Sequence, residues 1–353
     1  MSRRTCAAAG VRLLRWFDRT RRDLPWRRTT NPWAIWVSEV MLQQTRVEAV
    51  REPFQRFLAA FPNPAAFAAA DDDALLVAWR GLGYYRRARL LREGARRVAA
   101  VHGGEVPRDP DALRELPGIG DYTFGAVASI AFGLPEVAID GNVLRVIARH
   151  RGIGEAIDTA AARKLIRRVS GEWLDAARPG DFNQALMELG AMVCTPTAPR
   201  CGDCPLVADC VAKASDRTAE LPVQRPPRAN LEVAARVVLV TGRRGVLGHR
   251  AAAGEPNAGQ VDLPGAGVLT SVDEVDLPAH LWRRYAARID VGAELTSVRH
   301  AITHHRITVH AHAGAVRRRG ALDWFPLHAT TPWTTPARKV FRRAFGADGT
   351  MPA

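Results

Sequence analysis

The stretch LPGIGDYTFGA, residues 116–126, places two glycines around an isoleucine, directly before a run of small and apolar residues. Gly118 and Gly120 can adopt backbone angles that are closed to other residues, and they let a second chain approach closely. The run TFGAVASIAF that follows predicts a helix, so the turn leads into a helix N-terminus, where backbone N–H groups bind phosphate. The turn alone is equally compatible with a plain connector between two helices. Because it lacks a Gly-Lys-Ser/Thr ending, it disfavours ATP.

The composition points to a polyanionic partner. The chain has 353 residues, enough for two or three domains, with 47% hydrophobic residues and a formal net charge of +14. Residues 1–222 hold 32 Lys and Arg against 26 Asp and Glu, and residues 223–353 hold 18 against 10. Both parts are basic without an extended charged tail, which favours nucleic acid over a membrane face. No apolar run reaches the roughly 18 to 20 residues that a membrane span needs.

The N-terminal stretch MSRRTCAAAGVRLLRWF begins basic and becomes amphipathic with further arginines. It predicts a helix rather than a signal peptide. We therefore expect a cytoplasmic, nucleoid-associated monomer in which disulfides are absent.

The spacing of apolar residues changes along the chain. From about residue 9 to 214, long apolar-periodic segments alternate with short Gly/Pro breaks, which predicts an almost entirely helical region. The helices are expected at 34–60, 71–79, 84–101, 122–133, 142–151, 160–176 and 181–193. The polar, Pro-rich stretch 215–232 is typical of a linker. Strands are then expected at 233–242 and 306–316, and helices near 278–287 and 336–345, which together predict an α+β domain.

Four cysteines, Cys194, Cys201, Cys204 and Cys210, are separated by six, two and five residues. Four clustered thiols in a chain without expected disulfides favour a metal. Structural zinc usually takes two CxxC pairs, whereas this stretch has one pair and two single cysteines. The spacing favours a structural iron–sulfur cluster, with zinc as the alternative. Arg200 in this loop is predicted to reach a phosphate.

The cysteine loop, LPGIG and Asp140 together resemble the helix-hairpin-helix DNA glycosylases that carry a [4Fe–4S] cluster, the endonuclease III superfamily. Five further segments resemble the MutY-type adenine glycosylases of that superfamily. They are LPWRR (24–28), WVSEVMLQQTRV (36–47), GLGYYRRAR (81–89), VAIDGNVLRV (137–146) and FNQALMELGAMVC (182–194). The resemblance covers about residues 9 to 222, and the remainder resembles the Nudix-like recognition domain of these enzymes only weakly.

The resemblance implies a mainly α, helix-hairpin-helix catalytic region at 1–214, with a six-helix barrel module and an iron–sulfur module whose loop spans 194–210. A linker at 215–232 and a smaller, divergent α+β, Nudix-like domain at 233–353 follow. The implied partner is double-stranded DNA that carries adenine opposite 8-oxoguanine or guanine, and the implied reaction is the removal of that adenine in base excision repair.

Hydrolysis of an N-glycosidic bond needs a proton for the leaving base, stabilisation of a sugar cation, and a water; two carboxylates can supply all three. Glu39 lies inside the apolar stretch WVSEVML, where burial would raise its pKa as a general acid requires; a salt-bridged helix glutamate is the alternative. Asp140 precedes a predicted helix and fits an N-cap. The resemblance implies that Glu39 protonates adenine at N7 and later helps to activate water. It implies that Asp140 stabilises the oxocarbenium ion, electrostatically or through a transient covalent bond, with support from Asn142.

The target base must leave the duplex to reach these groups. The resemblance assigns the stack near the oxidised guanine and the contacts with that guanine to Gln44, Tyr84, Thr45 and Leu82. It assigns the adenine pocket to Trp26, Arg27, Leu42 and Gln184. By residue type alone, Trp26 and Leu42 would be placed in a core. The resemblance also makes the turn at Gly118 and Gly120 a grip on the DNA backbone, which positions the protein without reading sequence.

Tyr122 lies where strand-cleaving members of the superfamily have a lysine that forms a Schiff base with the sugar. A phenol cannot do this, and the first lysine in the chain is Lys164. The sequence therefore predicts a monofunctional glycosylase. The alternatives are a bifunctional glycosylase and abasic-site lyase, and a non-catalytic iron–sulfur protein that binds DNA or senses redox state.

The C-terminal half departs from the family pattern. The Phe-Ser-His recognition loop of the family is matched by Ile302, Thr303 and His304, so a hydroxyl donor for the guanine is kept and the phenylalanine is lost. We expect discrimination of 8-oxoguanine to be weaker or to use other residues. VDLPGAG (261–267) replaces a Trp-containing segment. No Nudix catalytic box is present, since SVDEVD (271–276) is too short and lacks an arginine, which disfavours nucleotide hydrolysis.

Overall fold

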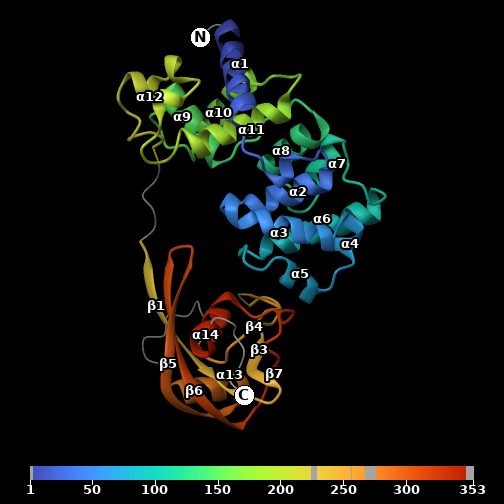
Figure 1. The fold of residues 1–353 in the computed structure, drawn as a ribbon, viewed down its shortest axis with the longest axis vertical. Coiled ribbons are helices and arrows are strands. Elements are labelled where there is room, and N and C mark those ends of the chain that lie inside the picture. Colours follow the sequence, from blue (N-terminus) through green and yellow to red (C-terminus); the bar gives the residue numbers. More distant parts are fainter. Residues whose placement is uncertain (1–2, 224–228, 256, 267–275, 347–353) are drawn as a thin grey trace. The chain divides into compact units, whose positions relative to one another are not determined.

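The computed structural model describes residues 3–223, 229–255, 257–266 and 276–346, and it gives no side-chain detail before residue 8. The chain forms two units, Met1–Ala69 with Arg86–Pro226, and Ala70–Tyr85 with Pro227–Ala353 (Figure 1). The change of unit after residue 226 falls inside the predicted linker 215–232, of which 224–228 lie outside the described residues. The predicted domain bounds stay a prediction.

The first unit is helical, as the sequence predicts. Its helices are α1 (Arg3–Thr20), α2 (Pro32–Leu42), α3 (Val47–Ala60), α4 (Pro64–Ala68), α6 (Arg86–Val101), α7 (Pro110–Arg114), α8 (Asp121–Phe132), α9 (Gly141–Arg151), α10 (Ala160–Trp173), α11 (Pro179–Met192) and α12 (Val211–Ala214), with short 3-10 turns at Pro25–Arg27, Cys201–Asp203 and Val207–Asp209. The short helices α4, α7 and α12 were not predicted, because a single turn carries too few apolar positions to establish a period. The six-helix barrel arrangement stays a prediction.

The single helix predicted at 34–60 is wrong. Helix α2 ends at Leu42 and α3 begins at Val47, and between them Gln44 has a left-handed φ of 54°. Apolar residues lie on both sides of the break, because α2 is buried all round and α3 buries one face, so the apolar pattern could not reveal it. Arg87 stabilises the break by donating from Nη1 to the carbonyl oxygens of Val40 and Met41, at 2.7 and 3.0 Å. A cation at the end of a helix takes up carbonyl groups that have lost their helical partners.

The core of the first unit places the site. Helices α1, α9, α10 and α11 share one apolar cluster that includes Phe17, Ile147, Trp173 and Phe182. Helix α8 is packed closely against the segment that leads to Asp140, since a Cβ on Gly125 would lie 2.2 Å from the carbonyl oxygen of Val137. Only glycine permits this approach, so the start of α9 is fixed beside α8.

The second unit is the predicted α+β region. Strand β1 (Leu231–Leu239) runs parallel to β6 (His305–Arg318), which pairs antiparallel with β5 (Arg288–Ile302) in a sheet of order β1-β6-β5. A smaller sheet holds β2 (Thr241–Gly242), β3 (Gly245–Arg250), β4 (Val261–Asp262) and β7 (Asp323–Phe325). Helices α13 (Leu277–Tyr285) and α14 (Thr335–Phe345) pack on β5, and α5 (Asp72–Ala78) belongs to the same unit (Figure 1).

The β strands were predicted in part. The strands expected at 233–242 and 306–316 are confirmed as β1 and β6, whereas β5 was missed. Most of β5 is exposed or half-buried and polar, so it lacks the apolar alternation of a core strand. The segments VDLPGAG and SVDEVD extend into residues 267–275, which lie outside the described residues. The resemblance of this unit to a Nudix-like domain stays a prediction.

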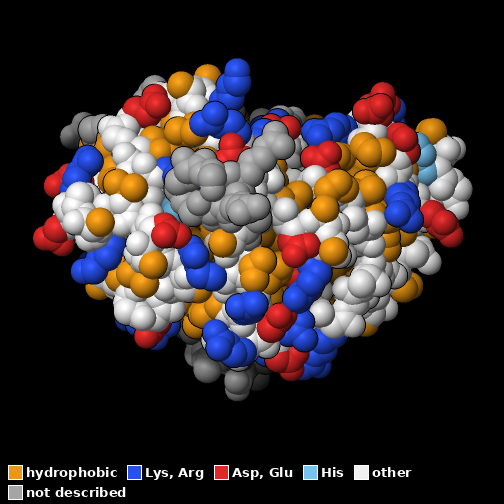
Figure 2. Space-filling view, turned by 90° about the horizontal axis from the view of Figure 1, so that it is seen from above, with side chains coloured by type: hydrophobic (Ala, Val, Ile, Leu, Met, Phe, Trp, Pro, Cys, Tyr) orange, Lys and Arg blue, Asp and Glu red, His pale blue; other side chains and the backbone are white. Residues whose placement is uncertain are grey.

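Charges of both signs are mixed on one face of the molecule. On the face drawn in Figure 2, Lys and Arg side chains lie among acidic and apolar ones rather than in one field. Among the described residues, no helix combines the length and apolarity that a membrane crossing requires.

Candidate active site and cysteine pocket

Glu39 is a buried acid of the first unit. It lies on α2, where residues 33–41 are all buried, and only 4% of its surface is exposed. Burial raises the pKa of Glu39 to about 7; a hydrogen bond from Tyr122 opposes the shift, and the charge of Asp140 adds to it. A carboxyl group with this pKa is partly protonated near neutral pH, as a general acid must be.

Tyr122 is the partner of this acid. It lies in the first turn of α8, and its hydroxyl group donates a hydrogen bond to Glu39 Oε2. Met187 Sδ lies 3.5 Å from the same hydroxyl oxygen. Burial and the neighbouring carboxylates raise the pKa of Tyr122 well above its usual value. The phenol therefore keeps its proton and acts as a donor to the Glu39 carboxylate.

Asp140 is both an N-cap and a carboxylate in the site. Its Oδ1 accepts from Val143 N at 2.8 Å and its Oδ2 from Asn142 Nδ2 at 2.7 Å, at the start of α9. Burial raises the pKa of Asp140, and these hydrogen bonds oppose the shift. The N-cap expected from the sequence is thus confirmed, and the cap fixes the carboxylate in place.

Arg145 connects this carboxylate to the cysteine region. Its Nη2 donates to Asn142 Oδ1 at 2.7 Å and to the Gly190 carbonyl at 2.9 Å, and its Nε donates to the Cys194 carbonyl at 2.8 Å. The close contact of α9 with α11 needs glycine at 190, since a Cβ there would lie 2.5 Å from Asn142 Cβ. Asn142 is therefore held from two sides while it supports Asp140.

A cavity of about 890 Å³ opens over these groups. The structure brings together in its lining Leu42, Gln44, Thr45, Gly118, Gly120, Tyr122, Asp140 and Asn142. Gly118 has a φ of 83° and Gly120 is the N-cap of α8, so the turn between α7 and α8 forms one wall. No lysine lines the cavity. Backbone N–H groups at a helix start, the Asp140 carboxylate and Tyr122 thus face one space that is open to a nucleotide-sized ligand. Glu39 is not in the lining of this cavity and lies behind it, hydrogen-bonded to Tyr122.

Two of the four residues assigned to the adenine pocket, Arg27 and Gln184, contact each other. Arg27 Nε donates to Gln184 Oε1 at 3.1 Å, and both residues line a second cavity of about 310 Å³. Trp26 is buried edge-on against Phe54, with 5.6 Å between ring centroids. Leu42 lines the larger cavity instead.

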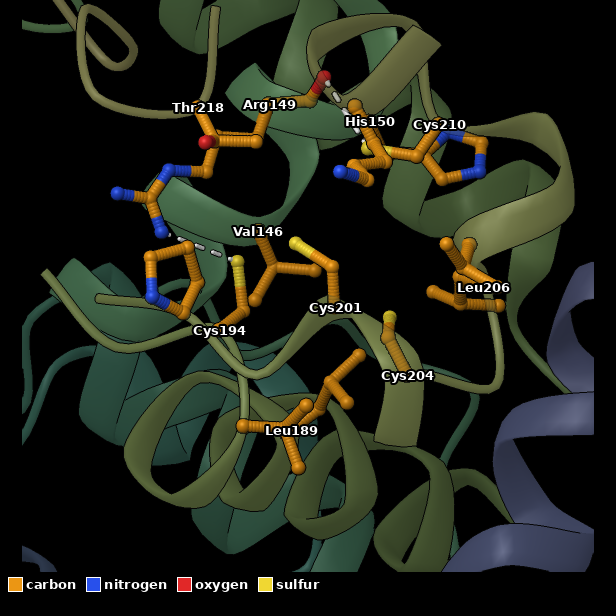
Figure 3. A pocket seen from close by; sticks show the side chains of 14 residues that line it. Val146, Arg149, His150, Leu189, Cys194, Cys201, Cys204, Leu206, Cys210 and Thr218 are labelled. Atoms are coloured by element: carbon orange, nitrogen blue, oxygen red, sulfur yellow. Dashed lines mark hydrogen bonds between the residues drawn. The ribbon is translucent and has the colours of Figure 1, made fainter. Parts of the chain in front are cut away.

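The four cysteines surround a third pocket. Cys194, Cys201, Cys204 and Cys210 all line it, with Val146, Leu189 and Leu206 among the apolar residues around them (Figure 3). Arg149 Nη1 lies 3.4 Å from Cys194 Sγ and donates to the Thr195 carbonyl at 2.6 Å. Burial, together with the three neighbouring thiols, raises the pKa of Cys204 to about 12. Thiols this close lose their protons together only when a cation compensates them.

Comparison with known proteins places this geometry in a family. Residues 37–171 match the HhH-GPD superfamily of base excision DNA repair proteins. The adenine DNA glycosylase of Mycolicibacterium smegmatis is 45% identical over 197 residues, which cover 56% of this chain and 67% of that protein. The chain belongs to the adenine DNA glycosylase family. The human adenine DNA glycosylase is also 45% identical, over 210 residues, and the chain spans 38% of its length.

Two solved structures resemble the helical region of this chain in fold. A thermostable thymine-DNA glycosylase superposes with a TM-score of 0.53 at 29% identity, covering 58% of this chain and 95% of that one. An endonuclease III in a non-covalent DNA complex gives a TM-score of 0.53 at 24% identity, covering 61% and 98%. The predicted helix-hairpin-helix fold is thereby confirmed for the helical region of this family member.

The remaining predicted residues are not in the linings of these cavities. Leu82 is buried and Tyr84 is 47% exposed with a φ of 48°, and both belong to the second unit. Thr303 and His304 form the turn between β5 and β6 of that unit, where Thr303 has a φ of 52°. Arg200 donates to the Met192 carbonyl at 2.9 Å and lies 3.4 Å from Asp203, so it is engaged within its own loop.

Sequence reasoning missed three charged residues around the family's site: Arg87, Arg145 and Glu188. Each forms a hydrogen bond with a predicted site residue: Arg87 with Thr45, Arg145 with Asn142, and Glu188 with Arg27. Helical spacing could have identified Arg145 and Glu188. Arg145 lies three residues after Asn142 and Glu188 four after Gln184, which are the separations that share a helix face. Arg87 had no such signal, because its contacts lie on another helix.

Proposed function

We propose that the protein is a monofunctional DNA glycosylase that hydrolyses the N-glycosidic bond of adenine mispaired with 8-oxoguanine or guanine in duplex DNA. The observation that carries the proposal is the buried Glu39, with a pKa of about 7, hydrogen-bonded to Tyr122, which lines a nucleotide-sized cavity together with Asp140. The family membership supports the choice of adenine as the base.

The reaction follows from the two carboxyl groups. Protonated Glu39 gives its proton to N7 of the flipped adenine, so that the bond between C1′ and N9 breaks and its electron pair leaves with the base. The Asp140 carboxylate stabilises the sugar cation that forms. Water then adds at C1′ and passes its proton to the Glu39 carboxylate, which restores the acid. Tyr122 keeps Glu39 oriented and limits the rise of its pKa.

Strand cleavage is not expected. A lyase needs an amine that adds to C1′, and no lysine lines the cavity while Tyr122 fills the place that the family resemblance gives to that amine. Covalent trapping with borohydride should give no enzyme–DNA adduct. Nicking at the abasic product above the spontaneous rate would contradict this part of the proposal.

The cysteine pocket fits an iron–sulfur cluster. The thiols of all four cysteines line one space. Their uneven spacing along the chain, with one CxxC pair and two single cysteines, favours a [4Fe–4S] cluster over one zinc ion. Cys194, Cys201, Cys204 and Cys210 would hold it. The cluster would tie the loop to α9, where Arg149 and Arg145 already bind this loop and the Cys194 carbonyl.

The deciding experiment is excision from four duplexes that pair adenine with 8-oxoguanine, guanine, cytosine or thymine. Release of adenine opposite the first two alone is the expected result. Glu39→Gln should still bind the mispaired duplex and should release no base. Unchanged excision by Glu39→Gln would remove Glu39 from its role, and absence of adenine release from every duplex by the unaltered protein would refute the function.

A further inference from the structure

Glu188 on α11 is a buried carboxylate that binds two arginines. Its exposed fraction is 2%, and it accepts from Arg22 Nε at 2.8 Å, from Arg22 Nη2 at 2.6 Å and from Arg27 Nη1 and Nη2 at 3.1 Å each. Burial pushes the pKa of Glu188 upward, but the hydrogen bonds and charges of the two arginines outweigh it and lower the pKa to about 2. The carboxylate is therefore ionised at any working pH.

This carboxylate fixes the orientation of Arg27. The guanidinium group also donates from Nη1 to the Arg22 carbonyl at 3.2 Å, and its carbon lies 5.3 Å from the centroid of the Phe17 ring. Bidentate pairing with Glu188 sets the plane of the Arg27 guanidinium group. The Arg22 carbonyl and the Phe17 ring restrict the other orientations of that group. Arg27 Nε is left pointing at one acceptor, Gln184 Oε1, at 3.1 Å.

The orientation of Arg27 in turn determines whether the amide NH₂ group or the amide oxygen of Gln184 is available to a base. Because the amide oxygen of Gln184 accepts from Arg27, its NH₂ group is the part that remains for a base. Gln184 lies three residues before Met187, whose sulfur is 3.5 Å from the Tyr122 hydroxyl oxygen, and the charge of Arg27 acts on Glu39, so this amide belongs to the surroundings of the catalytic acid. Adenine presents only unprotonated ring nitrogens, which accept such a donor. Hypoxanthine and guanine present N1–H, which does not. If Arg27 turned away, the amide could rotate and offer its oxygen, an acceptor that suits N1–H.

We propose that Glu188 is a positioning residue that sets base selectivity, acting through Arg27 on the amide orientation of Gln184. This inference rests on the proposed adenine glycosylase function. It assigns to Glu188 no contact with the base and no part in the proton transfers.

The test compares single-turnover release of adenine and hypoxanthine opposite 8-oxoguanine by the full chain. Glu188→Gln keeps the size of the side chain but removes its charge and turns one of its two acceptors into a donor. We expect its adenine-to-hypoxanthine rate ratio to fall at least about tenfold. Binding of the duplex should stay within about twofold, because backbone contacts are untouched.

The matched control is Arg22→Gln, which breaks the other half of the buried ion pair and leaves the Arg27 fork on Glu188. It should lower the melting temperature yet keep the wild-type ratio. An unchanged ratio in Glu188→Gln, or an equal fall in both variants, would overturn the inference and leave Glu188 a stabilising residue. If the wild type releases no adenine at all, the proposed function fails and the inference fails with it.

Discussion

The hydrogen bond between Tyr122 and Glu39 predicts how the reaction depends on pH. Glu39 must be protonated to act as an acid, so kcat/KM of the wild type should decline above about pH 7. In the wild type, the Tyr122 hydroxyl donates to the Glu39 carboxylate and thereby lowers the pKa of Glu39. Tyr122→Phe removes this donor. Without this donor the carboxyl group holds its proton to higher pH, and the alkaline decline should move upward.

The size of the shift follows from the energy of that bond. A hydrogen bond to a charged group contributes about 1.5 to 3 kcal/mol. At about 1.4 kcal/mol per pKa unit, its loss raises the pKa of Glu39 by about 1 to 2 units. At pH 8, about a tenth of the wild type carries the proton, against half or more of the variant. The rate at pH 8 relative to pH 6 should therefore rise severalfold in Tyr122→Phe, even if its absolute rate is lower.

The assay is adenine release from a duplex with 8-oxoguanine, measured as kcat/KM between about pH 5.5 and 9.5. Tyr285→Phe is the control, because it removes a buried phenol hydroxyl from the second unit, where that hydroxyl accepts from Arg284. The control should keep the wild-type profile. A decline that stays at the wild-type pH in Tyr122→Phe, or moves to lower pH, would refute the reasoning.

Three further changes test the structure. Glu39→Gln should be more stable than the wild type at pH 8 by about 3 kcal/mol and equal to it near pH 4.5. The reason is that the raised pKa of the Glu39 carboxyl lowers the stability of the wild type as pH rises from 4.5 to about 7. Equal denaturant midpoints at pH 8 would contradict this. Gly190→Ala should lower the stability by about 1 to 3 kcal/mol and should also lower excision, because the new Cβ would displace Asn142. The control Gly171→Ala places its Cβ in open space and should keep both stability and excision. Cys204→Ser should lower the iron bound per chain, measured by metal analysis and visible absorption; a full iron content would remove Cys204 from the ligand set.

The fold was predictable where information is local. The apolar period gave most helices of the first unit within a few residues, and the Pro-rich stretch near 215–232 preceded the change to strands. It failed at 43–46, where the break depends on Gln44 in a left-handed conformation and on Arg87 from another helix. It failed again at β5, where shifts of register against β6 interrupt the apolar alternation along the strand.

Residue type and spacing by themselves determined the candidate groups: an acid in an apolar helix, a capping aspartate, a glycine turn and four cysteines. The resemblance to the glycosylase superfamily added the tyrosine in place of an amine. Only the tertiary structure decided which groups meet. Tyr122 reaches Glu39 across 83 residues, and Glu188 reaches Arg27 across 161. The physical reason is that a periodic pattern records which face of a helix is buried but not which helix covers it. The hydrogen bonds that tune the pKa of Glu39 and orient Gln184 therefore exist only once the helices have packed.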